Sequence, residues 1–353
     1  MKVIEKPSVA LWDQVVSRSE YATFFHTPTW AQIIVETYPH FCIATKGFVL
    51  DDGTVAIVPL VATTERNGFF KWCESMFPGG YGGAVAERNL TQIEVDYIFQ
   101  RLMNAQTAYI HVMGNPYTRQ SLPLSFNQSP LHTHVLDLAE GFDAVFRNCS
   151  KGHRYSAGKA KKMGIQVGVA ETEEEFRSYY YKVYRDALKR WGDSTLVTYP
   201  YRLFEQIWLH RSENIKLWVA KVDGEMISGS LNFYHNRLVV AWHATTRENY
   251  FSHRPGPLLK TEIIRDACQR GFSYYDFSPS GGLKGVETYK EGFGAQKRSF
   301  DSYVWQDNKL YNAYHKLRHW GRSALRVSPL EHNGHSSQVA EVEPEDVNGQ
   351  SLQ

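Results

Sequence analysis

The chain has 353 residues and a formal net charge of +2 at neutral pH, and 14% of its residues are aromatic. This length favours two domains of roughly 150 residues. The small net charge argues against nonspecific nucleic-acid binding over the whole surface and leaves local basic patches open. The four cysteines form no CxxC pair and no close Cys/His cluster, so we expect no metal site.

Neither an apolar run of membrane-spanning length nor a signal-peptide pattern is present. We therefore expect a cytoplasmic protein with no membrane span. His132 and His134 alternate before a strand-like run and have no third ligand nearby in the sequence, so we expect them at the surface.

The first half begins with a helix pattern at 30–35, after the cap Thr27 and the early proline Pro28. Two β-branched runs, 40–50 and 54–62, flank Asp-Asp-Gly and predict a hairpin. The chain continues with a glycine-rich loop at 77–84, a helix over 90–106, and strands at 108–113 and 132–138.

The second half repeats this order. Its predicted elements are helices at 173–190 and 199–212, a hairpin at 216–234, a strand at 238–245, a helix at 257–270 and strands at 274–277 and 299–305. Element order thus predicts a duplicated architecture with its junction near 140–148. We expect domains at 1–145 and 146–306, a basic helix at 307–327 and a disordered tail at 328–353.

A helix start at Arg254-Pro-Gly-Pro-Leu-Leu259 is the first candidate site. The free N–H groups of a helix start bind phosphate. Arg254 adds positive charge, and Gly256 permits close approach of the backbone. The two prolines remove N–H donors, and an ordinary helix start with proline in its first turn is the alternative.

The stretch 276–294 is the second candidate. Asp276 ends a strand, a loop carries Lys284, and Lys290 stands between Tyr289 and a Gly-Phe-Gly turn. A lysine placed in this way can neutralise a diphosphate or a developing oxyanion. The alternatives are a solvated lysine and a loop-capping carboxylate.

The third candidate is a basic run at 147–163, interleaved with glycine and serine. It fits contacts to the phosphates of a cofactor, a nucleotide sugar or tRNA. A solvated helix face is the alternative.

Three C-terminal motifs carry a family resemblance: Arg-Pro-Gly-Pro-Leu-Leu at 254–259, Gly-Phe-Ser-Tyr-Tyr-Asp-Phe-Ser at 271–278 and Glu-Thr-Tyr-Lys-Glu-Gly-Phe-Gly-Ala at 287–295. The first half adds His-Thr-Pro-Thr-Trp-Ala at 26–31 and Gly-Gly-Tyr-Gly-Gly-Ala at 79–84. In this order the motifs resemble the FemAB-like and BioF2-like branch of the GNAT acyltransferase superfamily, which includes peptidoglycan bridge-forming aminoacyltransferases.

The resemblance implies an α/β (α+β) fold of two GNAT-like domains, each a mixed, mostly antiparallel sheet flanked by helices, with the basic helix packed back on the first domain. It implies transfer of an acyl or aminoacyl group to an amine, from acyl-CoA or aminoacyl-tRNA and without a metal. In bridge-forming members a lysine matching Lys290 serves catalysis and phosphate binding. Those members also carry a lysine shortly after the tryptophan that matches Trp30, where this chain has Gln32.

Our main hypothesis is an N-acyltransferase that moves an acyl group from an acyl-CoA-type donor to a small-molecule, peptide or glycan amine, in cell-wall or polysaccharide biogenesis. Lys290 would stabilise charge, Asp276 would orient or deprotonate the amine, and Tyr289 would position Lys290. The predicted donor-binding residues are Arg254, Gly256, Leu258 and Lys284.

Two alternatives stay open. One is a FemX-like aminoacyl-tRNA-dependent transferase acting on a cell-wall precursor or peptide, which would use the basic segments 151–162 and 309–326 against tRNA. The other is a non-catalytic glycan- or peptide-binding protein in which aromatic residues such as Trp242 and Tyr250 line a groove.

Overall fold

The computed structural model describes residues 1–63, 71–76, 79–104, 106–191, 198–307 and 309. Within these residues the strands form a four-stranded sheet in the order β1-β3-β4-β7 and an eleven-stranded sheet in the order β10-β11-β12-β13-β14-β9-β15-β8-β6-β5-β2. The predicted helix 307–327 and the tail 328–353 lie outside the described residues, apart from Asp307 and Lys309.

The first half follows the predicted order. Its elements are β1 (Lys2–Ile4), α1 (Val9–Arg18), η1 (Phe24–His26), α2 (Pro28–Thr37), β2 (Phe41–Ile43), β3 (Lys46–Val49), β4 (Val55–Val58), β5 (Val61–Thr63), β6 (Lys71–Ser75), β7 (Val85–Ala86), α3 (Gln92–Leu102) and β8 (Thr107–Met113). The Thr27 side chain caps α2 by accepting from the N–H of Trp30, with proline in the first turn, as predicted.

The predicted hairpin around Asp-Asp-Gly forms between β3 and β4. Each of the two predicted runs contains a second strand, β2 in the first run and β5 in the second. These two strands pair with each other in the larger sheet. The runs 40–50 and 54–62 therefore cross together from one sheet to the other.

The second half also agrees with the predicted order. It follows β9 (Asn127–Asp137), the last strand of the first half, and its elements are α4 (Gly141–Asn148), α5 (Lys151–Lys162), β10 (Gln166–Val169), α6 (Glu173–Ser178), the π-helix η2 (Tyr179–Tyr184), α7 (Arg185–Trp191), α8 (Tyr201–Leu209), β11 (Ile215–Val222), β12 (Glu225–His235), β13 (Leu238–Thr246), η4 (Glu248–His253), α9 (Pro255–Gln269), β14 (Tyr274–Asp276), α10 (Lys284–Glu291) and β15 (Gln296–Gln306). The predicted helix 173–190 is thus continuous but contains a π-helical turn, which its sequence did not indicate.

Each half contains one parallel strand pair linked by a helix. In the first half β6 pairs with β8 across α3, and in the second β13 pairs with β14 across α9. The other pairs among the described strands are antiparallel. The predicted mixed, mostly antiparallel α/β fold with repeated element order is confirmed.

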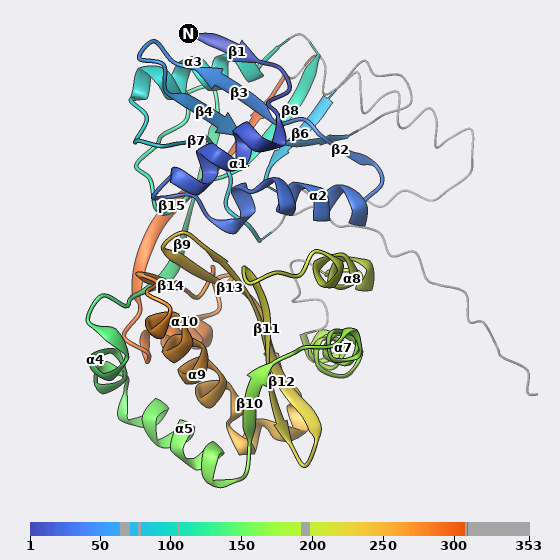
Figure 1. The fold of residues 1–353 in the computed structure, drawn as a ribbon, viewed down its shortest axis with the longest axis vertical. Coiled ribbons are helices and arrows are strands. Elements are labelled where there is room, and N and C mark those ends of the chain that lie inside the picture. Colours follow the sequence, from blue (N-terminus) through green and yellow to red (C-terminus); the bar gives the residue numbers. More distant parts are fainter. Residues whose placement is uncertain (64–70, 77–78, 105, 192–197, 308, 310–353) are drawn as a thin grey trace, which may run out of the picture.

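The two halves exchange their last strands. β9 follows β8 in the chain but pairs with β14, whereas β15 follows β14 but pairs with β8. β9 and β15 also pair with each other, from Gln296 opposite Val135 to Val304 opposite Asn127. Figure 1 shows these two strands running between the halves, which are joined in one continuous sheet.

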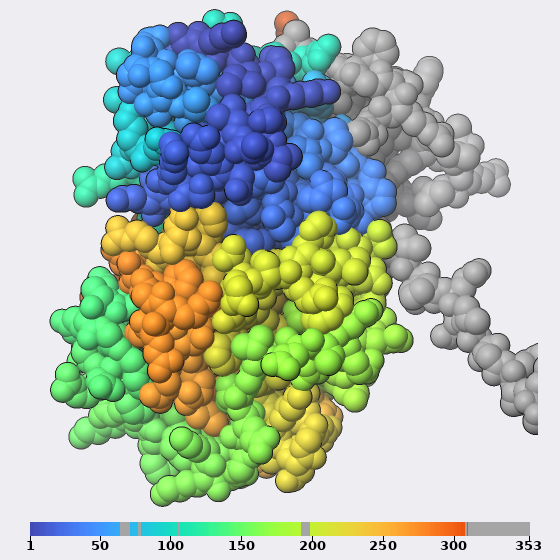
Figure 2. Space-filling model, in the orientation of Figure 1, coloured from blue at the N-terminus to red at the C-terminus, as the bar shows by residue number. Residues whose placement is uncertain are grey.

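An aromatic core connects the halves where α2 lies against β12 and β13. The Trp30 side chain is fully buried, with its ring 5.2 Å from Phe233 and 5.9 Å from Trp242, measured between centroids. Phe25 contacts both Trp30 and Phe233. In the face shown by Figure 2, the first half lies directly against the second.

Candidate active site

The sheet opens between β13 and β14. The two strands pair only from Leu238 opposite Tyr274 to Val240 opposite Asp276. β13 then continues along β12 to Thr246, while β14 ends at Asp276. Beyond Val240, the edge of β13 that faces β14 therefore has no strand partner among the described residues.

Unpaired polar atoms gather on the two segments that diverge at this opening. On β13 they are Trp242 Nε1, His243 Nε2 and Thr245 Oγ1, and beyond β14 they are Ser278 Oγ and Ser280 Oγ. All five are buried and have no hydrogen-bond partner among the described residues. Since buried polar groups are nearly always hydrogen-bonded in folded proteins, these atoms are candidates for contact with water or with a polar ligand.

Asp276 closes the narrow end of the opening. Its carboxylate is fully buried and accepts hydrogen bonds from Tyr81 Oη at 2.9 Å, Tyr117 Oη at 2.8 Å, Thr133 Oγ1 and the N–H of Ser278. Burial raises its pKa, and these hydrogen bonds oppose the rise. Because the two tyrosines come from the first half, Asp276 links the halves beside the opening.

Lys290 lies at the same end. Its side chain is 5% exposed, and Nζ donates to the carbonyl oxygen of Ser278 at 2.5 Å. Burial lowers its pKa to about 8, while the negative charges of Asp276 and Glu287 act in the opposite direction. The structure thus brings Lys290 and Asp276 together, as predicted for residues of one site.

The Gly-Phe-Gly turn holds α10 in place. A Cβ on Gly292 would come within 2.5 Å of the His153 ring, so the absence of a side chain allows α5 to approach this turn. Phe293 is buried between the rings of His153, Tyr289 and Phe277. The glycine next to Lys290's helix is therefore required by packing.

The start of α9 lies next to α10. Tyr289 Oη is 3.2 Å from the position that a Cβ on Gly256 would take. Burial raises the pKa of the Tyr289 hydroxyl. The side chain of Tyr289 therefore lies against the helix start that was predicted to bind the donor.

The first turn of α9 has one free donor of the kind that anions require. Pro255 and Pro257 have no N–H, the N–H of Arg254 donates to Phe251, and the N–H of Leu258 makes the first bond within the helix, which leaves the N–H of Gly256. Arg254 occupies the N-cap in the left-handed conformation at φ 56° and donates from Nη1 to Ser156 Oγ of α5 at 3.0 Å. The exposed basic face of α5 is thus tied to this helix start.

The two remaining predicted donor-binding residues, Leu258 and Lys284, differ in their exposure to solvent. Leu258 is buried in a small core with Ala157 and Ala160 of α5, so its side chain serves packing. Lys284 begins α10, with its side chain 79% exposed and Nζ 3.4 Å from Glu287. A direct role of either residue in donor binding stays a prediction, as does the shared cleft between Lys290 and the α9 start.

Two histidines of β9 face α10. His132 Nε2 is 2.8 Å from Glu287, and His134 Nε2 is 3.6 Å from Glu291. The surface prediction was wrong for His134, whose side chain is fully buried because α10 packs on this face of β9. Among the described residues no group of three or more His, Cys, Asp or Glu side chains is arranged to hold a metal.

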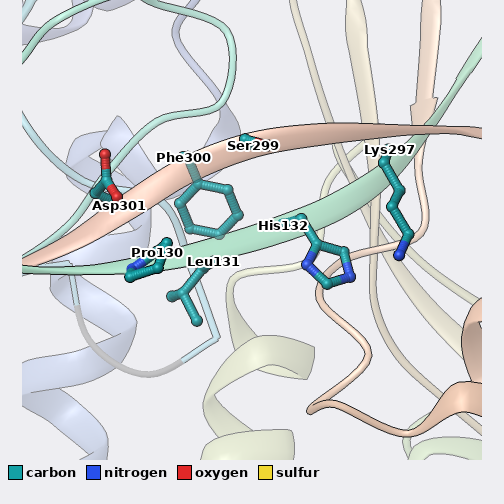
Figure 3. A pocket seen from close by; sticks show the side chains of 7 residues that line it. All are labelled: Pro130, Leu131, His132, Lys297, Ser299, Phe300 and Asp301. Carbon is teal, nitrogen blue, oxygen red and sulfur yellow. The ribbon is translucent and has the colours of Figure 1, made fainter.

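A cavity of about 430 Å³ adjoins α10 on β9 and β15. His132 and Lys297 lie at one end and Asp301 at the other, with Leu131 and Phe300 between them (Figure 3). Glu287 of α10 contacts both His132 and Lys297, the latter at 3.0 Å. The cavity is thus lined by residues that touch Lys290's helix.

A larger cavity of about 1250 Å³ lies mainly in the first half, where α1 and α2 contribute to its wall, and His210 of the second half also lines it. Gln32, at the position compared above with a family lysine, lines it and donates to Glu36 at 2.7 Å. None of the described helices has the length and apolar character needed to cross a membrane.

Sequence reasoning missed three residues of the site. Tyr81 and Tyr117 lie in loops, and nothing in their local pattern indicated contact with Asp276. Lys260 of α9 is 6% exposed. Its signal was present, because it stands four residues before Ile264 on the apolar stripe of a predicted helix.

The comparisons with known proteins agree with this geometry. The sequence model of the acetyltransferase (GNAT) domain matches residues 147–291. The comparison with curated proteins finds no match. Among solved structures, FemX is similar, with a TM-score of 0.67 and 11% identity over 89% of this chain and 99% of FemX.

Two further structures share the fold at a TM-score of 0.52 and 10% identity. One is the C-terminal domain of a putative lysylphosphatidylglycerol synthetase from Agrobacterium fabrum, with 89% of this chain and 95% of that one covered. The other is a conserved protein of unknown function from Bacteroides thetaiotaomicron VPI-5482, with 86% and 99% covered. The predicted GNAT resemblance is confirmed for residues 147–291, which match the acetyltransferase (GNAT) domain, and the chain as a whole shares the fold of FemX.

Proposed function

We propose that the protein transfers an acyl group from an acyl-CoA-type donor to an amine, with the reacting groups held in the opening between β13 and β14. The observation that carries this proposal is the set of five buried, unpaired polar atoms on the diverging segments. An extended ligand with amide and carbonyl groups would supply the missing partners.

The start of α9 fits the phosphate groups of such a donor. The N–H group of Gly256 and the positive end of the helix would hold phosphate. Arg254 and the exposed lysines of α5 add positive charge beside them. When bound, the donor supplies an activated thioester carbonyl.

The residues at the narrow end would stabilise and orient the reacting groups. The ammonium group of Lys290 would stabilise negative charge on the carbonyl oxygen, in a site from which burial excludes water. Asp276 holds Tyr81 and Tyr117 by hydrogen bonds and so fixes the wall that the amine approaches. The amine nitrogen bonds to the acyl carbon, the carbon–sulfur bond breaks, and a proton from the amine ends on the released thiolate.

The acceptor would enter through the cavity of about 430 Å³ beside α10. Its size suits a small molecule or the end of a peptide or glycan. Phe300, which lines the cavity, packs edge-on against Tyr81 with ring centroids 5.5 Å apart. Because Tyr81 donates to Asp276, the cavity wall and the proposed reaction centre are in direct contact.

An assay of thiol release from acetyl-CoA and longer acyl-CoAs, with a panel of amines, tests the proposal. We expect transfer by the wild type, and a loss of about 100-fold or more in kcat for Lys290→Ala, with donor affinity largely kept. Lys189→Ala, at an exposed lysine of α7, is the control. No thiol release with any donor, or an unchanged rate for Lys290→Ala, would contradict it.

Aminoacyl-tRNA is the second candidate donor. The observation in its favour is the exposed basic face of α5 beside the α9 start, with Lys151, Lys159, Lys161 and Lys162 in one helix. RNase treatment separates the two donors. Transfer that RNase abolishes supports aminoacyl-tRNA, whereas transfer from purified acyl-CoA in the presence of RNase excludes a requirement for it.

A further inference from the structure

Lys260 is a buried lysine with an unusual set of partners. It lies in α9 and is 6% exposed, and its Nζ donates to Ser230 Oγ of β12 at 2.9 Å and to Tyr275 Oη of β14 at 3.0 Å. Among the described residues no carboxylate lies within ion-pair distance of it. Lysine is rarely buried so completely without a counter-ion.

These contacts close into a ring of hydrogen bonds. Tyr275 Oη donates to Asn232 Oδ1 at 3.2 Å, and Asn232 Nδ2 donates to Ser230 Oγ at 3.1 Å. Each hydroxyl therefore has a second partner besides the lysine. Replacing the amino group would leave neither hydroxyl isolated.

The ring spans β13 at the point where the sheet opens. Ser230 of β12 pairs with Ala244, in the part of β13 that no longer pairs with β14. Tyr275 of β14 pairs with Val239, in the part of β13 that still does. A β-bulge interrupts the β12–β13 register between Leu231 and Asn232, beside the ring. Lys260 thus ties the strand that supports one wall of the opening to the strand that forms the other.

The protonation of the Lys260 amino group depends on its surroundings. Burial lowers the pKa of Lys260 to about 7, and the positive charge of Lys290 on α10 acts in the same direction. Burial also lowers the pKa of His243, which is on β13 and has its Nε2 unpaired among the described residues, and the charge of Lys260 acts in the same direction. Tyr275 on β14 is the other titratable group in contact with it, and burial raises the pKa of that hydroxyl.

We propose that Lys260 is a positioning residue of the acyl transfer, which fixes the separation of β13 and β14 by holding Ser230 and Tyr275 together beneath the acyl group of the donor. The proposal rests on the function proposed above. A methionine at this position would fill similar space without a buried amino group. A residue that only fills space has no need of an amino group, whereas hydrogen bonds to both Ser230 and Tyr275 require one.

The first test compares stability with activity in Lys260→Met. We expect a Tm equal to or a few degrees above that of the wild type, because a desolvated amino group is removed. We expect kcat/KM for acyl transfer to fall about 10- to 100-fold, because the walls of the site are no longer held at a fixed separation. Ile264→Val, which removes one buried methylene from the same helix, is the control and should retain wild-type kinetics.

The second test examines pH and coupling. Since the folded pKa of about 7 lies below the unfolded value of 10.5, the unfolded chain binds more protons between these values, and wild-type stability should rise relative to Lys260→Met as pH increases from 7 to 9. Tyr275→Phe should cause a similar kinetic loss. The double variant should be no worse than either single one, because both break the same tie.

The outcomes separate this inference from the proposed function. Wild-type transfer with unchanged kinetics in Lys260→Met, or kinetic losses that add in the double variant, would overturn the role of Lys260 and leave the function standing. A clear fall in the Tm of Lys260→Met together with the loss of activity would assign Lys260 a structural role. Absence of transfer by the wild type itself would remove both.

Discussion

At the scale of single residues, two lysines and one carboxylate are buried beside the opening between β13 and β14. Lys290 and Lys260 each lose part of their basicity through desolvation, and each ammonium group is also near the other. The carboxylate of Asp276 accepts hydrogen bonds from the hydroxyl groups of Tyr81, Tyr117 and Thr133, which belong to the first half. This clustering of perturbed groups beside an opening in the sheet is typical of active sites.

The pKa of about 8 for Lys290 predicts how activity depends on pH. Charge stabilisation requires the ammonium form, which is present below that value and is lost as pH rises through it. We expect kcat, corrected for the fraction of deprotonated acceptor, to fall above pH 8. In Lys290→Arg the residual activity should persist to pH 9.5, because arginine stays protonated.

Thiol-release rates between pH 6 and 9.5 check this prediction. Lys189→Arg, at an exposed lysine of α7, is the control for the exchange of lysine and arginine and should keep the wild-type profile. Identical pH profiles for the wild type and Lys290→Arg would show that Lys290 does not act through its charge.

At the scale of elements, the packing of α10 against α5 decides where Lys290 stands. The His153 ring occupies the space above Gly292, and its Nδ1 is 2.9 Å from Ser150 Oγ, so the ring cannot move freely. By contrast, a Cβ on Gly285, in the first turn of the same helix, would meet no atom within 4 Å.

Two glycine-to-alanine changes should therefore have opposite effects. Gly292→Ala should lower the free energy of unfolding by about 1–3 kcal/mol, because the methyl group overlaps His153. Gly285→Ala should leave it equal or raise it by up to about 1 kcal/mol through helix propensity. Urea unfolding measures both, and adding His153→Ala to Gly292→Ala should recover part of the loss. Equal stabilities for the two alanine variants would contradict the packing argument.

Most elements could be predicted from local signals. Asp-Gly turns marked the β3–β4 and β11–β12 hairpins, and Gly271 marked the end of α9. The partners of strands could not be predicted, because alternation of apolar residues identifies a strand without identifying its neighbour. For the same reason nothing in the sequence placed Tyr81 and Tyr117 on Asp276, more than 150 residues away.

Lys260 shows a different limit. Its position on the apolar stripe was visible in the sequence, but a lysine there is also compatible with a stem that reaches solvent. Only the tertiary arrangement shows its amino group ending between Ser230 and Tyr275 instead.

At the scale of the whole molecule, the exchange of β9 and β15 makes the halves interdependent. Without β15, the edge of β8 would be unpaired, and without β9, so would that of β14. Unpaired strand edges favour aggregation. The aromatic core around Trp30 also takes side chains from both halves.

The intact chain should consequently unfold in one cooperative transition. The separate fragments 1–145 and 146–306 should aggregate or remain unfolded when each is expressed alone, because the first lacks β15 and the second lacks β9. Co-expression of the two should recover folded material. Circular dichroism and gel filtration test this, and two fragments that are each monomeric with a sharp transition of their own would contradict it.

A structure determined with a non-hydrolysable acyl-CoA analogue tests the central claim most directly. The account predicts the acyl carbonyl between residues 242–245 of β13 and residues 278–280, with donor phosphates at the N–H group of Gly256 and the start of α9. A donor bound elsewhere, such as in the first-half cavity lined by Gln32, with the atoms of the β13–β14 opening still unpaired, would contradict it.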